Sequence, residues 1–481
     1  MTAAQAILKG IAGDGGLFVP EAFPDMSGRL AELAGLEYKA LAIEILRGYL
    51  TDFAPEELAD CVERAYDQKF DTPLIAPLAA CGGYNFLELY HGATLAFKDM
   101  ALSILPYFML TALKKTGSDS EIVILTATSG DTGKAALESF AGVKGVRIAV
   151  FFPEEGVSEI QKLQMTTQTG SNVHVIGIYG NFDDAQTGLK AIFSDAAFDA
   201  EMSRRGYTLS SANSINIGRL LPQVVYYFWA YAQLVRRGDI RTGQEINFTV
   251  PTGNFGNILA GYYARRMGLP VGKLICASNS NKVLYDFFRT GEYDKNREFV
   301  VTSSPSMDIL VSSNLERLLY HIENDPVKVG GLMQSLNAAG RYDFPSALLG
   351  SGAGSAGFIG FYADEDETRE AIKAAYDAGY LIDPHTAVAF ACYKKYAAQT
   401  GNDTPNVILS TASPYKFVQD VARSVGLDCK GDMFDLAGSL AHVSGTRVPQ
   451  QLLNLKNAPV LHNTKCAKTE IRGALERIFL E

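Results

Sequence analysis

The sequence predicts an α/β fold, and three observations support this. From about residue 120, short runs rich in apolar and β-branched residues alternate with helical stretches. Several of these runs are continuously apolar, which is typical of strands covered on both faces of a parallel sheet. The segments between them begin at Gly- or Asp-rich turns and end at a glycine, as helices do. We therefore expect strands at 121–128, 146–153, 171–180, 245–253, 273–278 and 406–413.

A helical N-terminal region is expected before the strands. From Glu37 to Phe70, apolar residues recur at three and four positions, and Pro55 with two following glutamates has the character of a helix first turn. Later helices are predicted at 131–142, 218–238 and 256–268. The stretch Leu348–Phe361 is rich in Gly, Ser and Ala, and we interpret it as a linker or mobile loop. The acidic segment Asp364–Glu370 then opens another helix.

Composition and charge exclude several classes of protein. The chain has 481 residues, 47% of them hydrophobic, so it can bury several cores without disulfides or structural metals. Its net charge of -10 and the lack of a basic stripe argue against a nucleic-acid partner. The six cysteines are dispersed without a C-x-x-C pair, which argues against a disulfide framework or a zinc site. The sequence is therefore that of an ordinary globular protein.

The N-terminal segment and the apolar runs indicate a compartment. Met1–Lys9 has neither the basic and apolar pattern of a signal peptide nor the Arg- and Ser-rich pattern of a transit peptide. The longest apolar run, Met100–Leu113, is too short to cross a bilayer and contains Pro106. We expect a cytoplasmic protein that has no membrane partner.

Three loops follow predicted strands, where open parallel sheets place their ligands. Thr128–Gly133 joins a strand to a helix and offers backbone N–H groups and hydroxyls to a small anion. Pro251–Asn257 does the same, and its two glycines let the backbone approach a phosphate. Ser410–Pro414 places two hydroxyls at a strand end. Each loop taken alone also has the composition of an ordinary turn.

Lys98 stands at the start of an apolar helical stretch, where acidic residues are usual. The positive end of the helix dipole and desolvation both lower the pKa of an ammonium group, which suits a lysine that acts as a neutral amine. The alternative is a structural lysine paired with the neighbouring Asp99.

Other motifs lack parts that their chemistry needs. Gly130–Lys134 resembles part of a Walker A loop, but Thr128 replaces its first glycine and Ala135 its Mg²⁺-binding hydroxyl. Gly352–Gly357 matches G-x-G-x-x-G without a convincing strand before it, so NAD is not indicated. The histidines are too scattered to predict a metal site or a triad, and His385 is interpreted as part of a helix N-cap turn.

Together, these loops and the lysine predict a pyridoxal phosphate site. Lys98 would form a Schiff base with the cofactor aldehyde, and the 253–257 loop would bind the phosphate. Thr411 would lie beside the pyridine nitrogen. The prediction depends on all of these residues meeting at one place.

The motifs also resemble the threonine synthase family, within the pyridoxal phosphate enzymes related to tryptophan synthase β and the serine/threonine dehydratases. The resemblance runs nearly end to end and matches the larger of two subfamilies, which has a long N-terminal region. The motifs that carry it are GIAGDGGLFVP (10–20), HGATLAFKD (91–99), TATSGDTGKAA (126–136), SANSINIGR (211–219), PTGNFGN (251–257), DPHTA (383–387) and STASPYKF (410–417).

The resemblance implies a role for each site residue. Lys98 is the Schiff-base lysine, Thr411 contacts the ring nitrogen, and Asp131 stands where many relatives have an Asn that touches the ring hydroxyl. The residues implied for the cofactor phosphate are Gly253, Asn254, Phe255, Gly256 and Asn257. The residues implied for the substrate are Thr128, Ser129, Gly130 and Thr132 in the anion loop, and Asn213, Ser214, Asn216 and Arg219 at the substrate phosphate. The guanidinium of Arg219 suits phosphate because it can donate two parallel hydrogen bonds.

The resemblance also implies an architecture: two lobes with doubly wound sheets of the tryptophan synthase β-like type. The expected parts are a helical region at 1–90, a smaller lobe at 91–240 with Lys98 and the anion loop, and a larger lobe at 241–481 with the cofactor-phosphate loop and Thr411. We expect a monomer or a homodimer without a metal site.

The implied reaction converts O-phospho-L-homoserine and water to L-threonine and phosphate by γ-elimination and β-addition of water, with Lys98 as the base. One alternative is a related lyase, such as a serine/threonine dehydratase or a sulfhydrylase, whose substrates lack a distal phosphate. A more remote alternative is a noncatalytic binding protein of the same fold. The segment Asn213–Arg219 argues against the first alternative, and Lys98 argues against the second.

Overall fold

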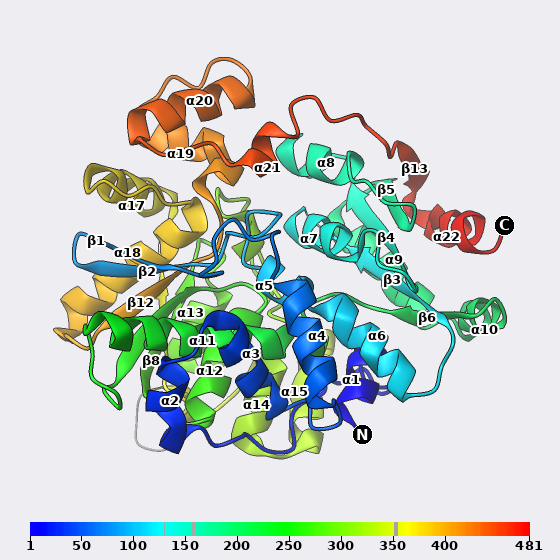
Figure 1. The fold of residues 1–481 in the computed structure, drawn as a ribbon, viewed down its shortest axis with the longest axis horizontal. Coiled ribbons are helices and arrows are strands. Elements are labelled where there is room, and N and C mark those ends of the chain that lie inside the picture. The colour runs from blue at the N-terminus through cyan, green and yellow to red at the C-terminus, as the bar shows by residue number, and fades with distance from the viewer. Residues whose placement is uncertain (129, 156, 158, 351–354) are drawn as a thin grey trace.

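The computed structural model describes the whole chain except residues 129, 156, 158 and 351–354. Within the described residues, the strands form a sheet of six strands, a sheet of five strands and a two-stranded ribbon (Figure 1). Helices cover both faces of the two main sheets, so the predicted α/β fold with two lobes is confirmed.

The larger sheet has the strand order β1–β2–β12–β7–β8–β11 in the described part of the chain. Neighbouring strands run parallel except in the β1–β2 hairpin. Its strands are β1 (Leu78–Cys81), β2 (Tyr84–Glu88), β7 (Ile246–Pro251), β8 (Val271–Ser278), β11 (Phe358–Tyr362) and β12 (Asn406–Ser410). Every residue of β7 is buried, and its two polar side chains, Asn247 and Thr249, donate hydrogen bonds to Asn402 and Asn406 at 3.0 Å.

The smaller sheet is parallel throughout its described strands, in the order β13–β5–β4–β3–β6. Its strands are β3 (Glu121–Ala127), β4 (Val146–Pro153), β5 (Val173–Tyr179), β6 (Tyr207–Ser210) and β13 (Thr464–Ala467). The ribbon pairs β9 (Glu292–Asp294) with β10 (Arg341–Asp343).

The helices predicted at 131–142, 218–238 and 256–268 are present as Asp131–Phe140, Ile217–Arg237 and Gly256–Arg266. The helices that the text does not place elsewhere are α2 (Leu30–Ala34), α6 (Leu105–Lys115), α8 (Glu159–Thr166), α10 (Ala196–Arg204), α13 (Val283–Thr290), α14 (Leu315–Glu323), α15 (Pro326–Ala339), α16 (Ser346–Leu349), α19 (Val418–Ser424), α20 (Met433–Ser444) and α21 (Gln450–Leu453). The expected acidic helix is α17 (Glu365–Asp377), and Asp364 caps it by accepting a hydrogen bond from the backbone of Glu367 at 2.9 Å.

The helical N-terminal region contains α1 (Ala3–Lys9), α3 (Tyr38–Arg47) and α4 (Pro55–Ala65), with Pro55 at the first position of α4 as expected. Helices α1 and α3 pack against the long helix α11 (Ile217–Arg237), α1 also lies on α6, and α4 packs on α3 and α6. The N-terminal region therefore covers α11 rather than forming a separate unit.

Each main sheet is buried on both faces because alternate residues of a strand point to opposite sides. In β12, Val407 and Leu409 face the core shared with α11 and α12 (Gly256–Arg266), whereas Ile408 faces the core under α17 and α18 (Pro384–Thr400). In β3, Ile124 belongs to the same core as α11, whereas Val123 faces α9 (Phe182–Phe193). One core therefore runs through both lobes.

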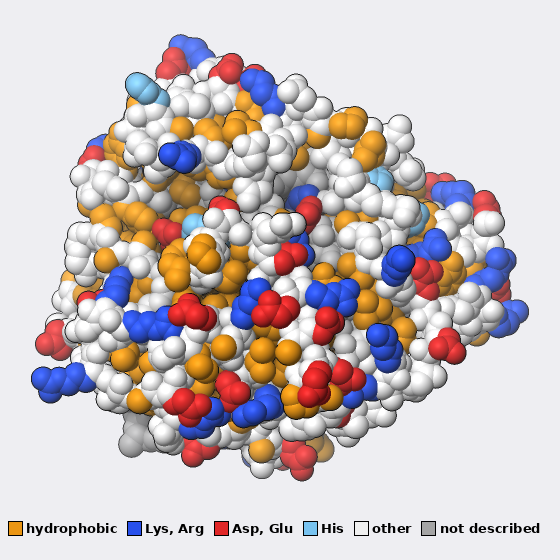
Figure 2. All heavy atoms as spheres, in the orientation of Figure 1, with side chains coloured by type: hydrophobic (Ala, Val, Ile, Leu, Met, Phe, Trp, Pro, Cys, Tyr) orange, Lys and Arg blue, Asp and Glu red, His pale blue; other side chains and the backbone are white. Residues whose placement is uncertain are grey.

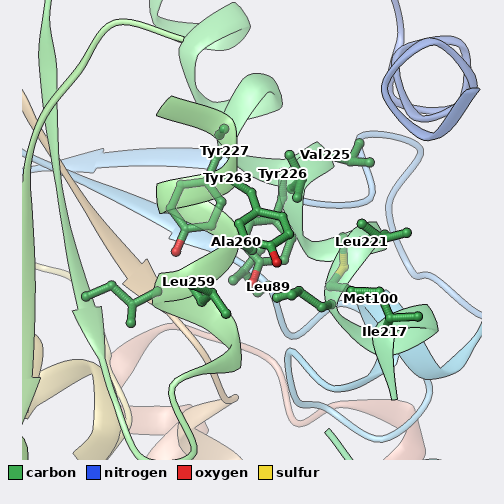
Figure 3. Close-up of a cluster of buried hydrophobic side chains, with 14 of the residues drawn as sticks. Leu89, Met100, Ile217, Leu221, Val225, Tyr226, Tyr227, Leu259, Ala260 and Tyr263 are labelled. Atoms are coloured by element: carbon green, nitrogen blue, oxygen red, sulfur yellow. The ribbon is translucent and has the colours of Figure 1, made fainter. Parts of the chain in front are cut away.

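The centre of that core lies between α11 and α12. Tyr226 and Tyr227 of α11 and Tyr263 of α12 lie among aliphatic side chains such as Leu221 and Leu259 (Figure 3). The side chains drawn there are apolar apart from tyrosine hydroxyls, and a buried hydroxyl needs a hydrogen-bond partner. The hydroxyls of Tyr226 and Tyr227 both donate hydrogen bonds to Asn257, which belongs to the candidate site described below.

The predicted linker at Leu348–Phe361 is wrong at both ends, because Leu348 and Leu349 are the last residues of α16 and Phe358–Phe361 lie in β11. Phe358 begins β11, which pairs with β8 at the edge of the larger sheet. Its ring stacks on Phe288 with the ring centroids 5.2 Å apart. This short strand was not predicted because the sequence just before it is rich in Gly, Ser and Ala, a composition typical of loops. Residues 351–354, which include the first three of the six positions of the G-x-G-x-x-G match, lie outside the described residues.

The sheets also cross the predicted domain boundaries at residues 90 and 240. The hairpin β1–β2 precedes residue 90 and joins the larger sheet through β12. At the other end, β13 follows residue 463 and pairs with β5 of the smaller sheet. Figure 1 shows the C-terminal helix α22 (Ile471–Phe479) beside the smaller lobe. The three-part division remains a proposal.

The surface carries both signs of charge. Lys and Arg side chains are interspersed with Asp and Glu on the face shown in Figure 2. In the described part of the chain, no helix combines the length and apolarity that crossing a membrane requires.

The C-terminal segment should contribute to the stability of the smaller lobe, because Leu475 of α22 is fully buried against it. We expect Leu475→Ala to lower the free energy of unfolding by about 2–5 kcal/mol through lost contacts and a cavity. Arg477→Ala, two residues on and exposed, is the matched control and should cost less than about 0.5 kcal/mol. Urea denaturation measures both, and equal values for the two variants would contradict the prediction.

Candidate active site

Segments from both lobes meet at Lys98. Lys98 directly precedes the short helix α5 (Asp99–Leu102), which lies between the two lobes (Figure 1). The Phe97 N–H donates to the Thr411 carbonyl at 2.8 Å, and the Ser413 N–H donates to the Leu95 carbonyl at 3.0 Å. These backbone bonds join the lysine segment to the end of β12, so the two predicted motifs are adjacent in space.

The Lys98 amine is buried, with 13% of its side chain exposed. Its Nζ lies 3.4 Å from Ser306 Oγ and 3.8 Å from Asp131 Oδ2. Burial lowers the pKa of Lys98 to about 8, although Asp131 acts in the opposite direction. Asp99 instead accepts a hydrogen bond from the Thr94 N–H at 2.8 Å, so the geometry does not support the structural pairing with Lys98.

The anion loop is shaped by its own first residue. Thr128 Oγ1 accepts hydrogen bonds from the N–H groups of Gly130 and Gly133, at 2.9 and 2.8 Å. Gly130 has a φ of +137°, and a Cβ there would lie 2.4 Å from the side chain of Gln161, so only glycine fits. Thr132 is half-buried, and Ser129 lies outside the described residues. The loop carries Asp131 to the start of α7 (Asp131–Phe140).

Asp131 has more partners than the sequence suggested. Its Oδ1 lies 3.0 Å from Lys416 Nζ and 3.0 Å from Gln161 Nε2, and its Oδ2 accepts a hydrogen bond from Ser306 Oγ at 3.0 Å. Burial alone would raise the pKa of Asp131, but Lys416 and Lys98 outweigh it and hold the pKa well below its usual range. The carboxylate is therefore ionised.

The glycine loop after β7 forms a cradle. A Cβ at Gly253 would lie 2.6 Å from the Ser306 carbonyl oxygen, so this position requires glycine. Phe255 adopts a left-handed conformation with φ +64°, which turns the chain into α12 at Gly256. Asn254 is exposed, and its carbonyl accepts from Asn314 Nδ2 at 2.9 Å. The backbone N–H groups at the start of α12 are donors of the kind that a helix N-terminus offers to an anion.

Asn257 carries an unused donor. Its Oδ1 accepts hydrogen bonds from the Tyr226 and Tyr227 hydroxyls at 2.6 and 3.0 Å. Its Nδ2 is buried and has no hydrogen-bond partner among the described residues. A buried N–H without a partner is costly, so the two tyrosines orient this amide toward a missing acceptor. A phosphate oxygen would satisfy it.

Arg219 is a second predicted site residue with a buried nitrogen, Nε, that has no hydrogen-bond partner. Only 3% of the residue is exposed, and its Nη1 donates to the Ala212 carbonyl at 2.6 Å. Its Nε has no partner, and no carboxylate of a described residue forms an ion pair with it. Burial lowers the pKa of Arg219 to about 10, which leaves it charged near neutral pH. An anionic ligand would supply the missing counter-charge.

The other residues of the substrate segment differ from one another. Asn216 caps α11, with its Oδ1 accepting from the Gly218 N–H and its Nδ2 donating to two backbone carbonyls. Its contacts therefore leave no donor for a ligand and indicate a structural role. Ser214 Oγ accepts from Asn314 Nδ2 at 3.4 Å, and Asn213 is half-buried. Both remain substrate-binding predictions.

Thr411 and His385 lie at the ends of neighbouring elements. Thr411 is 5% exposed, and its hydroxyl makes no hydrogen bond within the described part of the chain. The prediction that His385 belongs to a helix N-cap turn is confirmed, because Asp383 caps α18 and accepts from the His385 N–H at 2.9 Å. However, His385 Nε2 also accepts from the Ser306 N–H at 3.1 Å, which connects it to the site.

Sequence reasoning missed Ser306, Lys416 and Gln161. Lys416 lies in a quoted motif, STASPYKF, but nothing in its neighbours distinguishes it from a surface lysine. Ser306 and Gln161 lie in segments without a recognised motif. Within the described residues, no group of three His, Cys, Asp or Glu side chains could bind a metal ion.

Comparisons with known proteins agree with this geometry. The family described as pyridoxal-phosphate dependent enzyme matches residues 70–412. The region described as threonine synthase N terminus matches residues 1–66, and the one described as threonine synthase, C-terminal, matches residues 386–459.

Individual relatives extend the comparison. A human protein named threonine synthase-like 1 is 40% identical over 436 residues, which make up 88% of this chain and 58% of the human protein. This chain thus spans less than two thirds of that relative. The threonine synthase of Schizosaccharomyces pombe is 38% identical over 464 residues, with 89% of this chain and 87% of the relative covered.

A solved structure covers the chain completely. It is the crystal structure of PLP-bound threonine synthase from Brucella melitensis, which is 35% identical and has a TM-score of 0.86. The alignment covers 100% of this chain and 96% of that one. The likeness therefore includes both lobes and the N-terminal region.

Lys416 should be required for stability as well as for the charge of Asp131. We expect Lys416→Met to lower the free energy of unfolding by about 3–5 kcal/mol, because it leaves a buried carboxylate without its nearest counter-charge. The control is Lys430→Met, at an exposed ion pair, which should have a negligible effect. Urea denaturation at pH 7 measures both, and similar values would refute the role of Lys416.

The Lys98 amine should lose its proton near pH 8. We expect its acetylation rate in the cofactor-free protein to rise with pH and to reach half its maximum at about pH 8, because burial disfavours the ammonium form. In urea the same lysine should show the ordinary value of 10.5. Peptide mass spectrometry measures the rates, and identical midpoints in the two states would contradict the burial argument.

Proposed function

Because this chain belongs to the threonine synthase family of pyridoxal-phosphate dependent enzymes, we propose that it converts O-phospho-L-homoserine and water to L-threonine and phosphate. Its cofactor is pyridoxal 5'-phosphate, and Lys98 is the residue that binds the aldehyde. The observation that carries the proposal is Lys98 itself. Its amine is buried and has a lowered pKa beside a loop suited to phosphate.

The residues around Lys98 fit the cofactor. The Gly253 cradle, the N–H groups at the start of α12 and the unpaired Nδ2 of Asn257 would hold its phosphate. The Thr411 hydroxyl would face the ring nitrogen. A neutral hydroxyl there, in place of a carboxylate, disfavours the side reaction of transamination. When bound, the cofactor accepts the electron pair that remains on a substrate carbon after proton removal.

Lys98 supplies the proton transfers in this proposal. As a neutral amine it takes the Cα proton of the substrate, and it must give that proton up again before it can take a second one from Cβ. Asp131 lies 3.8 Å away and stays ionised, so it stabilises the ammonium that Lys98 becomes. Burial excludes bulk water, so a proton held by Lys98 can return to the substrate.

Arg219 favours a substrate with a distal phosphate. Its guanidinium is buried and lacks a carboxylate partner among the described residues, so a phosphate group would relieve an uncompensated charge. Asn213 and Ser214 lie six and five positions before it in the sequence and would complete the phosphate site. Substrates of dehydratases and sulfhydrylases have no group to satisfy this arginine, so phosphohomoserine is the better match.

The biological setting is also part of the proposal. We expect a cytoplasmic enzyme of threonine biosynthesis that acts as a monomer or a homodimer on a small-molecule substrate. Interspersed surface charges and a net charge of -10 favour a protein that stays dispersed at high concentration.

The decisive experiment incubates the purified protein, loaded with pyridoxal phosphate, with O-phospho-L-homoserine. We expect threonine and inorganic phosphate in equal amounts. Lys98→Ala should reduce the rate by at least about 1,000-fold, since it removes both the covalent attachment and the base. Lys430→Ala, at an exposed site, should match the unmodified chain. Phosphate released with 2-oxobutyrate would instead identify a lyase, and no turnover would reject the proposal.

A further inference from the structure

A short turn at Pro305–Met307 contacts the reactive amine and the two ligand loops. Ser306 Oγ is 3.4 Å from Lys98 Nζ and 3.0 Å from Asp131 Oδ2. The Ser306 carbonyl oxygen is the atom that a Cβ at Gly253 would meet at 2.6 Å. This one residue therefore lies against the amine, the anion loop and the phosphate cradle.

The direction of both hydrogen bonds of the Ser306 hydroxyl follows from charge. Asp131 is ionised and can only accept, so the hydroxyl must donate its one proton to Oδ2. The oxygen can then only accept from Lys98, whose Nζ donates to it. Because the proton of Ser306 is committed to Asp131, the hydroxyl cannot occupy the lone pair of a neutral Lys98 amine. That lone pair stays available for reaction.

His385 holds the backbone of Ser306 through a hydrogen bond whose direction also follows from which atom can donate. The Ser306 N–H donates to His385 Nε2 at 3.1 Å, so that ring nitrogen carries no proton. The ring proton then lies on Nδ1, which is 2.7 Å from Asp383 Oδ2. Asp383 is fully buried and also accepts from the Thr386 N–H at 3.1 Å, so the pair has little freedom to move. Ser306, His385 and Asp383 resemble a hydrolase triad, but the imidazole bonds the backbone and not the hydroxyl.

We propose that Ser306 is a catalytic residue that orients the Lys98 amine, and that the Asp383–His385 pair positions Ser306 for this task. The hydroxyl accepts one N–H of Lys98 and aims the lone pair away from Asp131, toward the reacting carbon. When Lys98 carries a proton, the same hydroxyl and Asp131 hold it for return. This inference rests on the proposed function of Lys98 and adds a specific partner to it.

Several charged groups face Lys98 from the elements around it. Lys416 and Arg219 favour the neutral amine, whereas Asp131 and Asp99 favour the ammonium. None of these side chains is replaced in a variant of Ser306. Asp131 loses the hydrogen bond from Ser306 Oγ, but Lys416 and Gln161 still hold its other carboxylate oxygen at 3.0 Å. A shift in the titration of Lys98 in such a variant therefore reports the hydroxyl itself.

The test compares Ser306→Ala with Ser303→Ala. Ser303 lies in the same segment, but its hydroxyl donates to Glu365 at 3.2 Å, away from the amine. In the cofactor-free protein, Ser306→Ala should lower the midpoint of Lys98 acetylation by about one pH unit, because the ammonium loses an acceptor. In the loaded enzyme, kcat should fall about 10- to 100-fold with KM within about twofold, because orientation is lost without loss of substrate binding.

The two alanine variants should give different results if Ser306 orients the amine. Ser303→Ala should leave the midpoint, kcat and KM unchanged. Equal midpoints and equal kcat in the two alanine variants would overturn the proposal. If Ser306→Ala does not fold, as judged by circular dichroism, Ser306→Cys keeps the shape with a weaker acceptor. It should show the same two changes at smaller size, and an unchanged midpoint and kcat would again overturn the role.

The positioning role of His385 has its own pair of variants. His385→Gln places an amide oxygen where Nε2 stood and can accept the Ser306 N–H, whereas His385→Phe cannot. We expect His385→Phe to reproduce the midpoint shift and the loss of kcat seen in Ser306→Ala, and His385→Gln to recover at least about fivefold in kcat. Loss of stability in both variants without a midpoint shift would show a merely structural histidine and refute the positioning role.

Failure of this inference is distinguishable from failure of the proposed function. The acetylation measurement uses the cofactor-free protein and needs no substrate. If the unmodified enzyme makes threonine while the midpoint of Ser306→Ala is unchanged, only the inference is wrong. If the unmodified enzyme makes no threonine, the proposed function fails, and the midpoint still decides whether Ser306 controls the amine.

Discussion

The site depends on one buried carboxylate held between two buried lysines. Asp131 lies 3.0 Å from Lys416 and 3.8 Å from Lys98, and both ion pairs are shielded from water. Lys416 keeps Asp131 ionised, so the carboxylate never competes for the proton of Lys98. With the unpaired Arg219 close by, the region holds more positive than negative charge. Burial lowers the pKa of Lys98, and Lys416 and Arg219 act in the same direction. The surplus of positive charge favours an anionic ligand such as a phosphate group.

The fold produces this arrangement by joining strand ends from two sheets. The anion loop follows β3 in the smaller sheet, whereas the glycine loop follows β7 and Thr411 follows β12 in the larger sheet. The backbone bridge between Ala96 and Ala412 brings the Lys98 segment to the second group. The buried helix α11 carries Arg219 and the two tyrosines that orient Asn257. Rigid elements therefore hold each reactive group, which limits the reorganisation that catalysis would otherwise require.

Much of the fold was predictable, and the errors have local causes. The central strands were found because burial on both faces produces continuous apolar runs. The hairpin β1–β2 was missed, although Gly82 and Gly83 both have positive φ and a Gly-Gly pair is a turn signal. The edge strand β13 was missed because it has only four residues, Thr464–Ala467, and two of them are exposed. Short edge strands are stabilised by their neighbours, and their own composition reveals little.

By itself, the sequence determined the α/β fold, the three loops that are candidates for ligand binding and the lysine proposed to react. Each of these follows from local requirements: periodicity for buried strands, glycine for close approach of a loop, and a cation at a helix start. Only the tertiary structure decided that Lys416, Ser306 and His385 belong to the site and that Asn216 serves the scaffold. Ser306 stands 208 positions from Lys98, and a hydrogen bond across that separation depends on how two lobes pack together. The local sequence around Ser306 or Lys98 cannot predict this hydrogen bond, because the bond forms only when the whole chain folds and buries both residues.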